Sequence, residues 1–208
     1  VFSKVIPLNI TNFPVFVFTA LLPWNWFSSS LLAAGSTFTD SRDLLRHPNV
    51  HPATLVVVTL LAHLMTLLVS LPVLFWMLYW YDLSFPWLFL PAFPLLVLVQ
   101  GTLTVGLSFL IATANVFYRD VSQLIGILVS LLFFVTPVWF TPQSKGDYSF
   151  LFEINPMSLI VQNYRFVLLD QRGLDWPSLM TATLMGLGLL TIGYLVYRHF
   201  ESDVIDEI

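Results

Sequence analysis

Four polar residues between two long apolar stretches have the types and spacing of metal ligands. They are Asp40, Asp43, His47 and His51. Spacings of three and four residues would place such side chains on one face of a helix. Pro48 and Pro52 break a helix there, and the His-x-x-x-His pair lacks the Glu of the zinc-protease motif. We therefore expect a solvated loop or a docking surface for a partner, and no metal site.

His63 is the other residue with reactive chemistry, and it stands alone in an apolar stretch. Ionisable residues within a membrane are functional hypotheses by default, but no Ser or carboxylate lies at a catalytic spacing from it. A neutral His that is hydrogen-bonded to a neighbouring helix is the simpler interpretation. The chain has no cysteine and no Gly-rich phosphate loop. We expect no catalytic residue and no cofactor.

The composition is that of an integral membrane protein. Charged residues make up 10% of the 208 residues and hydrophobic residues 57%, whereas about 25% of a soluble domain is charged. The formal net charge of −4 is too small and too scattered for nucleic-acid binding. Such a chain has too little polar surface to face water on all sides.

Long stretches without Asp, Glu, Lys or Arg give the organisation of the chain. A helix needs roughly 20 apolar residues to cross the hydrocarbon core, and each stretch holds one such segment. In lipid the backbone must satisfy its own hydrogen bonds, so we expect an all-α polytopic transmembrane bundle in one domain over residues 1–208. The predicted spans are Phe13–Gly35, Thr54–Tyr79, Leu88–Ala114, Val121–Phe140 and Leu179–Tyr197. Because the first residues, from Val1, already read as the tail of an apolar segment, we interpret the chain as a fragment that is truncated at its N-terminus.

The segment Leu151–Leu169 is apolar but is interrupted by polar residues. Asn155-Pro156 splits it, because a residue before proline is disfavoured in a helix, and Asn163 and Arg165 need polar surroundings. A re-entrant helix pair is the structure that we expect, since irregular backbone at membrane depth must be covered by protein or line a water-filled cavity. An amphipathic helix lying flat on the membrane surface is the alternative.

Two clusters of aromatic residues stand at different places in the predicted spans. Residues 75–81 form an aromatic group at a helix end, which is typical of the interfacial belt. Trp24, Trp26 and Phe27 lie within a span, beside a proline. There a kinked helix that lines a cavity and simple packing against lipid both remain open. Aromatic faces could stack on sugar rings in the first case.

Small residues recur along the last predicted span, at Ala182, Gly186, Gly188 and Gly193. Such a stripe usually allows two membrane helices to pack closely. The orientation of the bundle stays open at this point, because Lys and Arg are divided four against four between the two sides.

Six segments resemble, in the same order, the membrane subunit of a type-2 ABC exporter from the branch that exports O-antigen, capsule and teichoic-acid polymers. They are Val1–Pro7, Leu21–Ser30, Ala114–Leu124 with its Tyr-Arg-Asp, Phe134–Phe140 with its Thr-Pro, Asn155-Pro156 followed by Tyr164-Arg165, and Gly193–Arg198. A complete member of this family has six spans, so the resemblance implies five in this fragment plus an outward re-entrant helix pair.

The resemblance also implies partners and an orientation. Two permease subunits would pair in the cytoplasmic (inner) membrane, and a separate ATP-binding cassette ATPase would drive export of a glycan. The loop before the second predicted span, the turn after the third predicted span and the C-terminus would face the cytoplasm, and Thr141–Pro177 would face outward. Candidate ATPase-coupling residues are Asp40, Arg42, Asp43, Arg46, His47, Arg119 and Asp120. Candidate channel or exit residues are Trp24, Trp26, Phe27, Asn155, Pro156, Asn163, Tyr164 and Arg165.

Two other functions fit an apolar bundle of this kind. A type-2 ABC exporter of a small lipophilic compound would have a cleft that opens to lipid instead of a wide channel lined by aromatic residues. A membrane glycosyl or acyl transferase would need Asp, His or Arg clustered at one membrane face as base and phosphate clamp. Only Asp43, His47 and His51 approach such a cluster.

Overall fold

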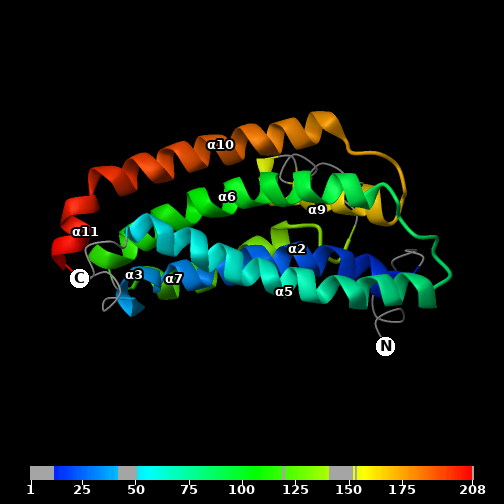
Figure 1. Ribbon diagram of the computed structural model, residues 1–208, viewed down its shortest axis with the longest axis horizontal. Helices are drawn as coiled ribbons and strands as arrows, with labels where there is room; N and C mark the ends of the chain where they lie inside the picture. Colours follow the sequence, from blue (N-terminus) through cyan, green and yellow to red (C-terminus); the bar gives the residue numbers. More distant parts are fainter. Residues whose placement is uncertain (1–11, 42–50, 119, 141–151, 153, 208) are drawn as a thin grey trace.

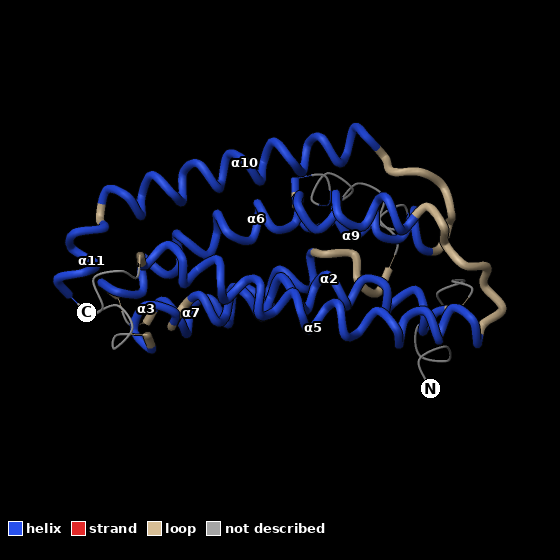
Figure 2. Tube along the Cα trace, in the orientation of Figure 1, coloured by secondary structure: helices blue, strands red, loops and turns tan. Residues whose placement is uncertain are grey.

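The computed structural model describes residues 12–41, 51–118, 120–140, 152 and 154–207, and all regular secondary structure within these ranges is helical. This confirms the predicted all-α class. Figure 2 shows long helices that lie side by side and are joined by loops. The helices are α2 (Phe13–Ala34), α3 (Thr37–Asp40), α5 (Pro52–Trp80), α6 (Phe89–Phe117), α7 (Val121–Val135), α9 (Pro156–Leu168), α10 (Trp176–His199) and α11 (Glu201–Glu207).

Four of the described helices, α2, α5, α6 and α10, are long and apolar enough to cross a membrane. They confirm four of the five predicted spans, with ends that differ by a few residues. Figure 1 shows these helices running along the long axis of the molecule, with α3 and α11 at one end and the α9–α10 connection at the other. The charge-free stretches of the sequence therefore became the long helices of the bundle.

The fifth predicted span, Val121–Phe140, is shorter than expected. Helix α7 has 15 residues and ends at Val135, so it is about 22 Å long against a hydrocarbon core of about 30 Å. Thr136 has an extended backbone with ψ of 131° because it precedes Pro137, which disfavours the helical conformation. The apolar sequence continues, but the helix does not.

Helices α6 and α10 approach each other most closely at two glycines. A Cβ atom built on Gly193 would lie 2.2 Å from the carbonyl oxygen of Gly106, so the two backbones touch. Ala182 and Gly186 are also buried along α10, which confirms close packing for most of the small-residue stripe. Gly188 was grouped with them wrongly, because nothing lies within 4 Å of a Cβ built there.

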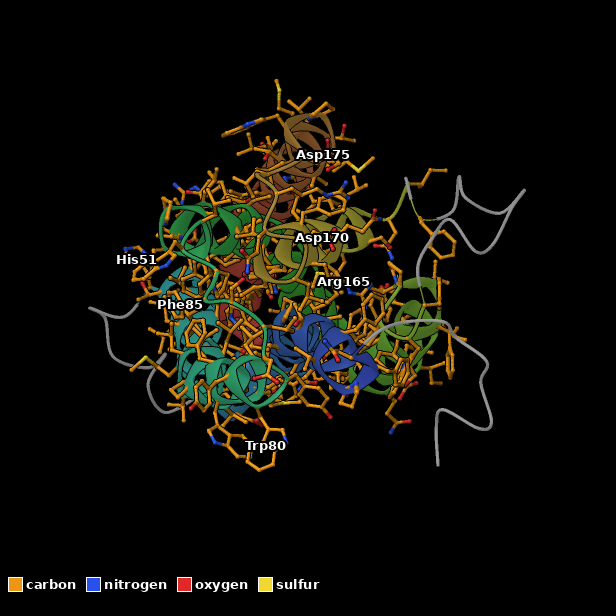
Figure 3. All side chains as sticks on the ribbon, turned by 90° about the vertical axis from the view of Figure 1, so that its right-hand side faces the viewer. His51, Trp80, Phe85, Arg165, Asp170 and Asp175 are labelled. Carbon is orange, nitrogen blue, oxygen red and sulfur yellow. The ribbon has the colours of Figure 1, made fainter. Side chains whose placement is uncertain are left out.

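The outer surface carries the apolar residues that lipid would contact. Val69 on α5 is 74% exposed and Leu184 on α10 is 68% exposed, whereas Leu96 and Leu103 on α6 are fully buried in the core. Trp80 is 69% exposed at the end of α5, and Figure 3 shows it projecting away from the bundle. This position agrees with an interfacial aromatic belt.

Helix α9 is enclosed by the bundle. Ten of its 13 residues are buried, and it packs against α2, α6 and α10. A helix lying flat on a membrane surface would expose one long side, so this alternative does not describe α9. Of the expected re-entrant pair the structure describes α9 itself, whereas Leu151 and Glu153 before it lie outside the described residues.

Candidate functional site

The polar candidate exit residues lie along α9, and both ends of this helix contact the segment that follows α7. Asn155 is the N-cap of α9, and its side-chain Oδ1 accepts a hydrogen bond from the backbone N–H of Met157 at 3.0 Å. Pro156 follows at the first helical position, where proline is favoured. The Nδ2 of Asn155 donates to the Oγ1 of Thr136 at 3.1 Å. One amide therefore both starts α9 and ties it to the residue after α7.

Arg165 makes a second link between the same two segments. Its guanidinium donates hydrogen bonds to the carbonyl oxygens of Pro137 and Val138, at 2.5 and 2.7 Å. A longer contact reaches the carbonyl of Phe140 at 3.4 Å. These carbonyls follow the proline that ends α7, so no helix satisfies them. The Thr-Pro and Tyr-Arg motifs, which lie far apart in the sequence, therefore meet in the structure.

The surroundings of Arg165 are unusual for a charged residue. The side chain is only 6% exposed, and the guanidinium carbon lies 3.6 Å from the ring centre of Phe16 on α2. Figure 3 places Arg165 in the interior, with Asp170 and Asp175 labelled nearby at the end that faces the viewer. Carbonyl dipoles and an aromatic face, rather than a carboxylate, compensate most of the burial. The protein itself therefore supplies the polar groups that the buried Arg165 side chain requires.

Asn163 performs a comparable task on the other side of α9. The side chain is fully buried, and its Nδ2 donates to the carbonyl of Leu159 and to the Oγ of Ser178, both at 2.9 Å. Its Oδ1 accepts from the backbone N–H of Asp175 at 2.9 Å. Asn163 therefore fixes the start of α10 against α9. The neighbouring Tyr164 is buried as well, and its hydroxyl finds no partner among the described residues.

Two of the three predicted aromatic channel residues lie beside this linked region. Trp24 and Phe27 line a largely apolar cavity of about 220 Å³, together with Thr136, Asn155 and Pro156. The ring of Trp24 lies 5.7 Å from that of Phe27 and 5.5 Å from that of Phe133 on α7. The structure thus brings the predicted aromatic residues and the Asn-Pro motif together around one cavity.

Trp26 lies on a different side of α2 from Trp24. Two residues along a helix correspond to a rotation of about 200°, which directs Trp26 toward α5. Its Nε1 donates to the carbonyl of Leu60 at 3.1 Å, and it packs against Leu60 and Leu67. This residue holds α2 and α5 together, so within the described chain it does not join the cavity of Trp24.

The candidate coupling residues fall at the opposite end of the bundle, where the structure describes only some of them. Asp40 ends α3 and Asp120 precedes α7, and both are exposed. The two elements lie close, because a Cβ built on Gly35 would be 3.3 Å from the Cβ of Ser122. The other candidates lie outside the described residues: Arg42, Asp43, Arg46, His47 and Arg119.

Tyr197 organises this end of the bundle, and the sequence alone did not single it out. Its hydroxyl donates to Oε1 of Glu201 at 2.9 Å, and its ring lies 5.3 Å from that of Phe109 and 6.1 Å from that of Phe38. Arg198 also pairs with Glu201. A buried aromatic residue with a polar tip near the end of a span was the only signal for this contact.

Comparison with known proteins adds an independent line of information. No protein-family model matches the chain. A Myxococcus xanthus protein named "O-antigen export system permease protein RfbA" is 33% identical over 213 aligned positions, which cover 100% of this chain and 80% of that protein. Two Klebsiella pneumoniae proteins of the same name are each 22% identical over 204 positions, covering 97% of this chain and 78% of those proteins.

Proposed function

The chain belongs to the O-antigen export permease family, and we propose that two copies of it form the membrane path of an ATP-driven exporter in the cytoplasmic membrane. As a member of this family it is a membrane subunit that takes part in moving polysaccharide, and not an enzyme. The observation that carries this conclusion is the 33% identity over the whole chain, joined to four helices long enough to cross a membrane.

The energy for export comes, in this proposal, from a separate ATPase. The sequence has no Gly-x-x-x-x-Gly-Lys-Ser/Thr loop for nucleotide phosphates. The ATPase would bind at the end of the bundle that carries α3, α11, Asp40 and Asp120, and this end would face the cytoplasm together with the C-terminus. Exposed charges at this end support a water-facing contact surface, whereas exposed tryptophans mark the region near the end of α5.

The opposite end would face outward and hold the exit of the glycan path. Support comes from the two links that join α9 to the residues after α7, through Asn155 and Arg165. Because both links act on the same short segment, α9 and the end of α7 would move as one body. Trp24 and Phe27 are buried beside them and would form part of the wall of this path, around the cavity that they line.

Pairing of two subunits would solve a problem that a single chain leaves open. Helix α7 is too short to span the hydrocarbon core, and one side of it exposes the apolar residues Ile127, Leu131 and Phe134. The five residues after it are not helical, but the same chain already covers them, because Thr136 and Val138 are buried and Arg165 binds the carbonyls of Pro137 and Val138. A second copy of α7 would instead cover the exposed apolar side of the helix.

A complementation experiment tests the proposed function. The gene would be deleted from a strain that displays O-antigen, and the chain would be returned with and without its ATPase. We expect surface polysaccharide only when both are present, and ATPase activity that purifies with the partner and not with this chain. Two results would contradict the proposal. One is an unchanged amount of surface polysaccharide after deletion of the gene, and the other is ATP hydrolysis by the purified chain alone in detergent.

A further inference from the structure

A row of polar side chains runs along the groove between α2 and α5, in the middle of both helices. Asn25 and Ser29 come from α2, and His63, Thr66 and Ser70 come from α5. We call these five residues the polar seam. The α5 members follow the spacing of one helix face, and Thr66 is the central residue of the 29-residue helix. The polar seam therefore lies at the depth where lipid tails surround the bundle.

Most of the polar seam has no hydrogen-bond partner in the described part of the chain. Ser70 satisfies itself, because its Oγ donates to the carbonyl of Thr66 at 2.8 Å. The side chains of Asn25, Ser29 and His63 make no hydrogen bond to the described residues, and neither does the hydroxyl of Thr66. Within the described residues, His63 therefore does not make the hydrogen bond to a neighbouring helix that the sequence led us to expect.

Lipid is an unsuitable neighbour for this groove. A polar group left unpaired in hydrocarbon costs several kcal/mol, and the polar seam gathers four of them. The adjacent surface of α5 behaves differently, since Met65 and Val69 are 61% and 74% exposed and apolar. The contrast between two neighbouring sides of one helix indicates that lipid covers the second side and something polar covers the first.

The walls of the groove are held in place by the protein. Trp26 lies between the two helices, where its Nε1 hydrogen bond to the carbonyl of Leu60 fixes their separation. Leu22 and Leu67 are buried beneath the polar side chains. The lining has no Asp, Glu, Lys or Arg. A preformed groove lined by amide, hydroxyl and imidazole groups, with no carboxylate, Lys or Arg, suits a ligand rich in hydroxyl groups better than an ion.

We propose that the polar seam is a contact path for the hydroxyl groups of the glycan during export. The inference rests on the proposed export function and adds to it a binding surface on α2 and α5. Amide, hydroxyl and neutral imidazole groups each donate and accept hydrogen bonds, as sugar hydroxyls do. A further membrane helix is the competing occupant, because Ser, Thr, Asn and His side chains also hydrogen-bond across membrane helices, and the labelling experiment below distinguishes the two.

Thiol labelling of the assembled exporter tests the location of the polar seam. Thr66→Cys is introduced into this cysteine-free chain, with Val69→Cys on the lipid side of α5 as the matched control. The probe is a charged, water-soluble methanethiosulfonate. We expect the reagent to modify Thr66→Cys and not Val69→Cys. When an ATPase-inactive partner stalls the exporter with glycan bound, the modification of Thr66→Cys should be slower. Membranes from cells unable to make the glycan give the unprotected rate.

Three results of the labelling experiment would overturn the proposal. The first is a Thr66→Cys residue that does not react, and the second is a reaction rate that is the same with and without glycan. The third is cross-linking of Thr66→Cys to another membrane helix, which would identify a helix as the occupant of the groove.

An export assay separates this inference from the function on which it rests. Thr66→Val and His63→Leu remove hydrogen-bonding groups, and Val69→Leu serves as the control on the lipid side. We expect loss of surface polysaccharide for the first two at unchanged amounts of permease in the membrane, and none for the control. If the unaltered chain restores export and both seam variants export at the same rate, the proposed role of the polar seam is wrong and the proposed export function is retained. If the unaltered chain restores nothing, the function itself is wrong.

Discussion

Arg165 donates a hydrogen bond to the carbonyl oxygen of Val138 at 2.7 Å, across 27 residues of sequence. This bond joins a charge in the last turn of α9 to the backbone that follows Pro137. Because proline ends α7 there, the carbonyls after it have no partner within a helix, and a forked guanidinium can serve several of them at once. The family motifs are therefore two halves of one structural contact.

Replacing Arg165 should break the contact between α9 and the segment that follows α7. Arg165→Ala leaves the carbonyls of Pro137 and Val138 buried and unpaired, at a cost of about 1–3 kcal/mol for each. Arg165→Lys should retain part of the stability, because an ammonium group can reach one carbonyl but lacks the planar fork. We expect the thermal midpoint in detergent to fall in the order Arg, Lys, Ala, and export to fall in the same order. Membrane insertion and ATPase pairing should persist, and unchanged export by Arg165→Ala would refute the exit-shaping role.

Asn155 allows the two tasks of one side chain to be measured separately. Asn155→Asp keeps the oxygen that caps α9 but loses the amide that donates to Thr136, whereas Asn155→Ala loses both. Loss of an N-cap costs about 0.5–2 kcal/mol. We expect Asn155→Ala to be less stable than Asn155→Asp in thermal unfolding. Export should fall in both variants if the link to Thr136 matters, and Thr136→Val should reproduce the effect of Asn155→Asp.

The glycines of α10 provide a matched pair for testing helix packing. Gly193→Ala would place a methyl group 2.2 Å from the carbonyl oxygen of Gly106, whereas Gly188→Ala would meet nothing within 4 Å. Overpacking typically costs about 1–3 kcal/mol, and here a backbone atom blocks relaxation. We expect Gly193→Ala to lower the thermal midpoint and the amount of folded protein, and Gly188→Ala to leave both unchanged. Equal behaviour of the two variants would contradict the contact between α6 and α10.

The fold was largely predictable from the sequence because membrane spans are long and free of charge. The exception was α7, where the apolar residues continue through Thr136 and Pro137 although the helix stops. Hydropathy records only that these residues are apolar. A proline by itself does not mark the stop, because Pro23, Pro72 and Pro94 lie inside α2, α5 and α6. The segment at Thr136-Pro137 differs in that Asn155 and Arg165 bind it from α9.

The sequence singled out the polar residues of α9 but not the contacts that they make. Arg165 lies in an apolar segment, so the sequence predicts that it needs polar partners. These partners are backbone carbonyls, which every residue has, so the sequence does not identify them. The difference between Trp24 and Trp26 depends on which helices surround α2, and composition does not contain that information. Conversely, His63 looked like a residue that another helix would satisfy, and only the structure shows it in an open groove with Asn25 and Ser29.

Thiol accessibility from the two sides of the membrane tests the proposed orientation. Ser122 is exposed at the start of α7, beside the turn that holds Arg119 and Asp120 in the sequence. Gly173 is exposed in the connection between α9 and α10, and a Cβ there would meet nothing within 4 Å. Both positions accept a single cysteine in a chain that has none of its own.

The expected labelling follows from the cost of moving a charge across lipid. An Arg at the centre of a bilayer costs at least about 2.5–3.5 kcal/mol, so the charged turn before Ser122 must rest at a water boundary. An impermeant maleimide added to intact spheroplasts should modify Gly173→Cys and spare Ser122→Cys. After permeabilisation both thiols should react. This would show that Ser122→Cys was unreactive in intact spheroplasts because it faces the cytoplasm, and not because it is buried. The reverse order of labelling would invert the topology, and with it the assignment of α3, Asp120 and α11 to the ATPase side.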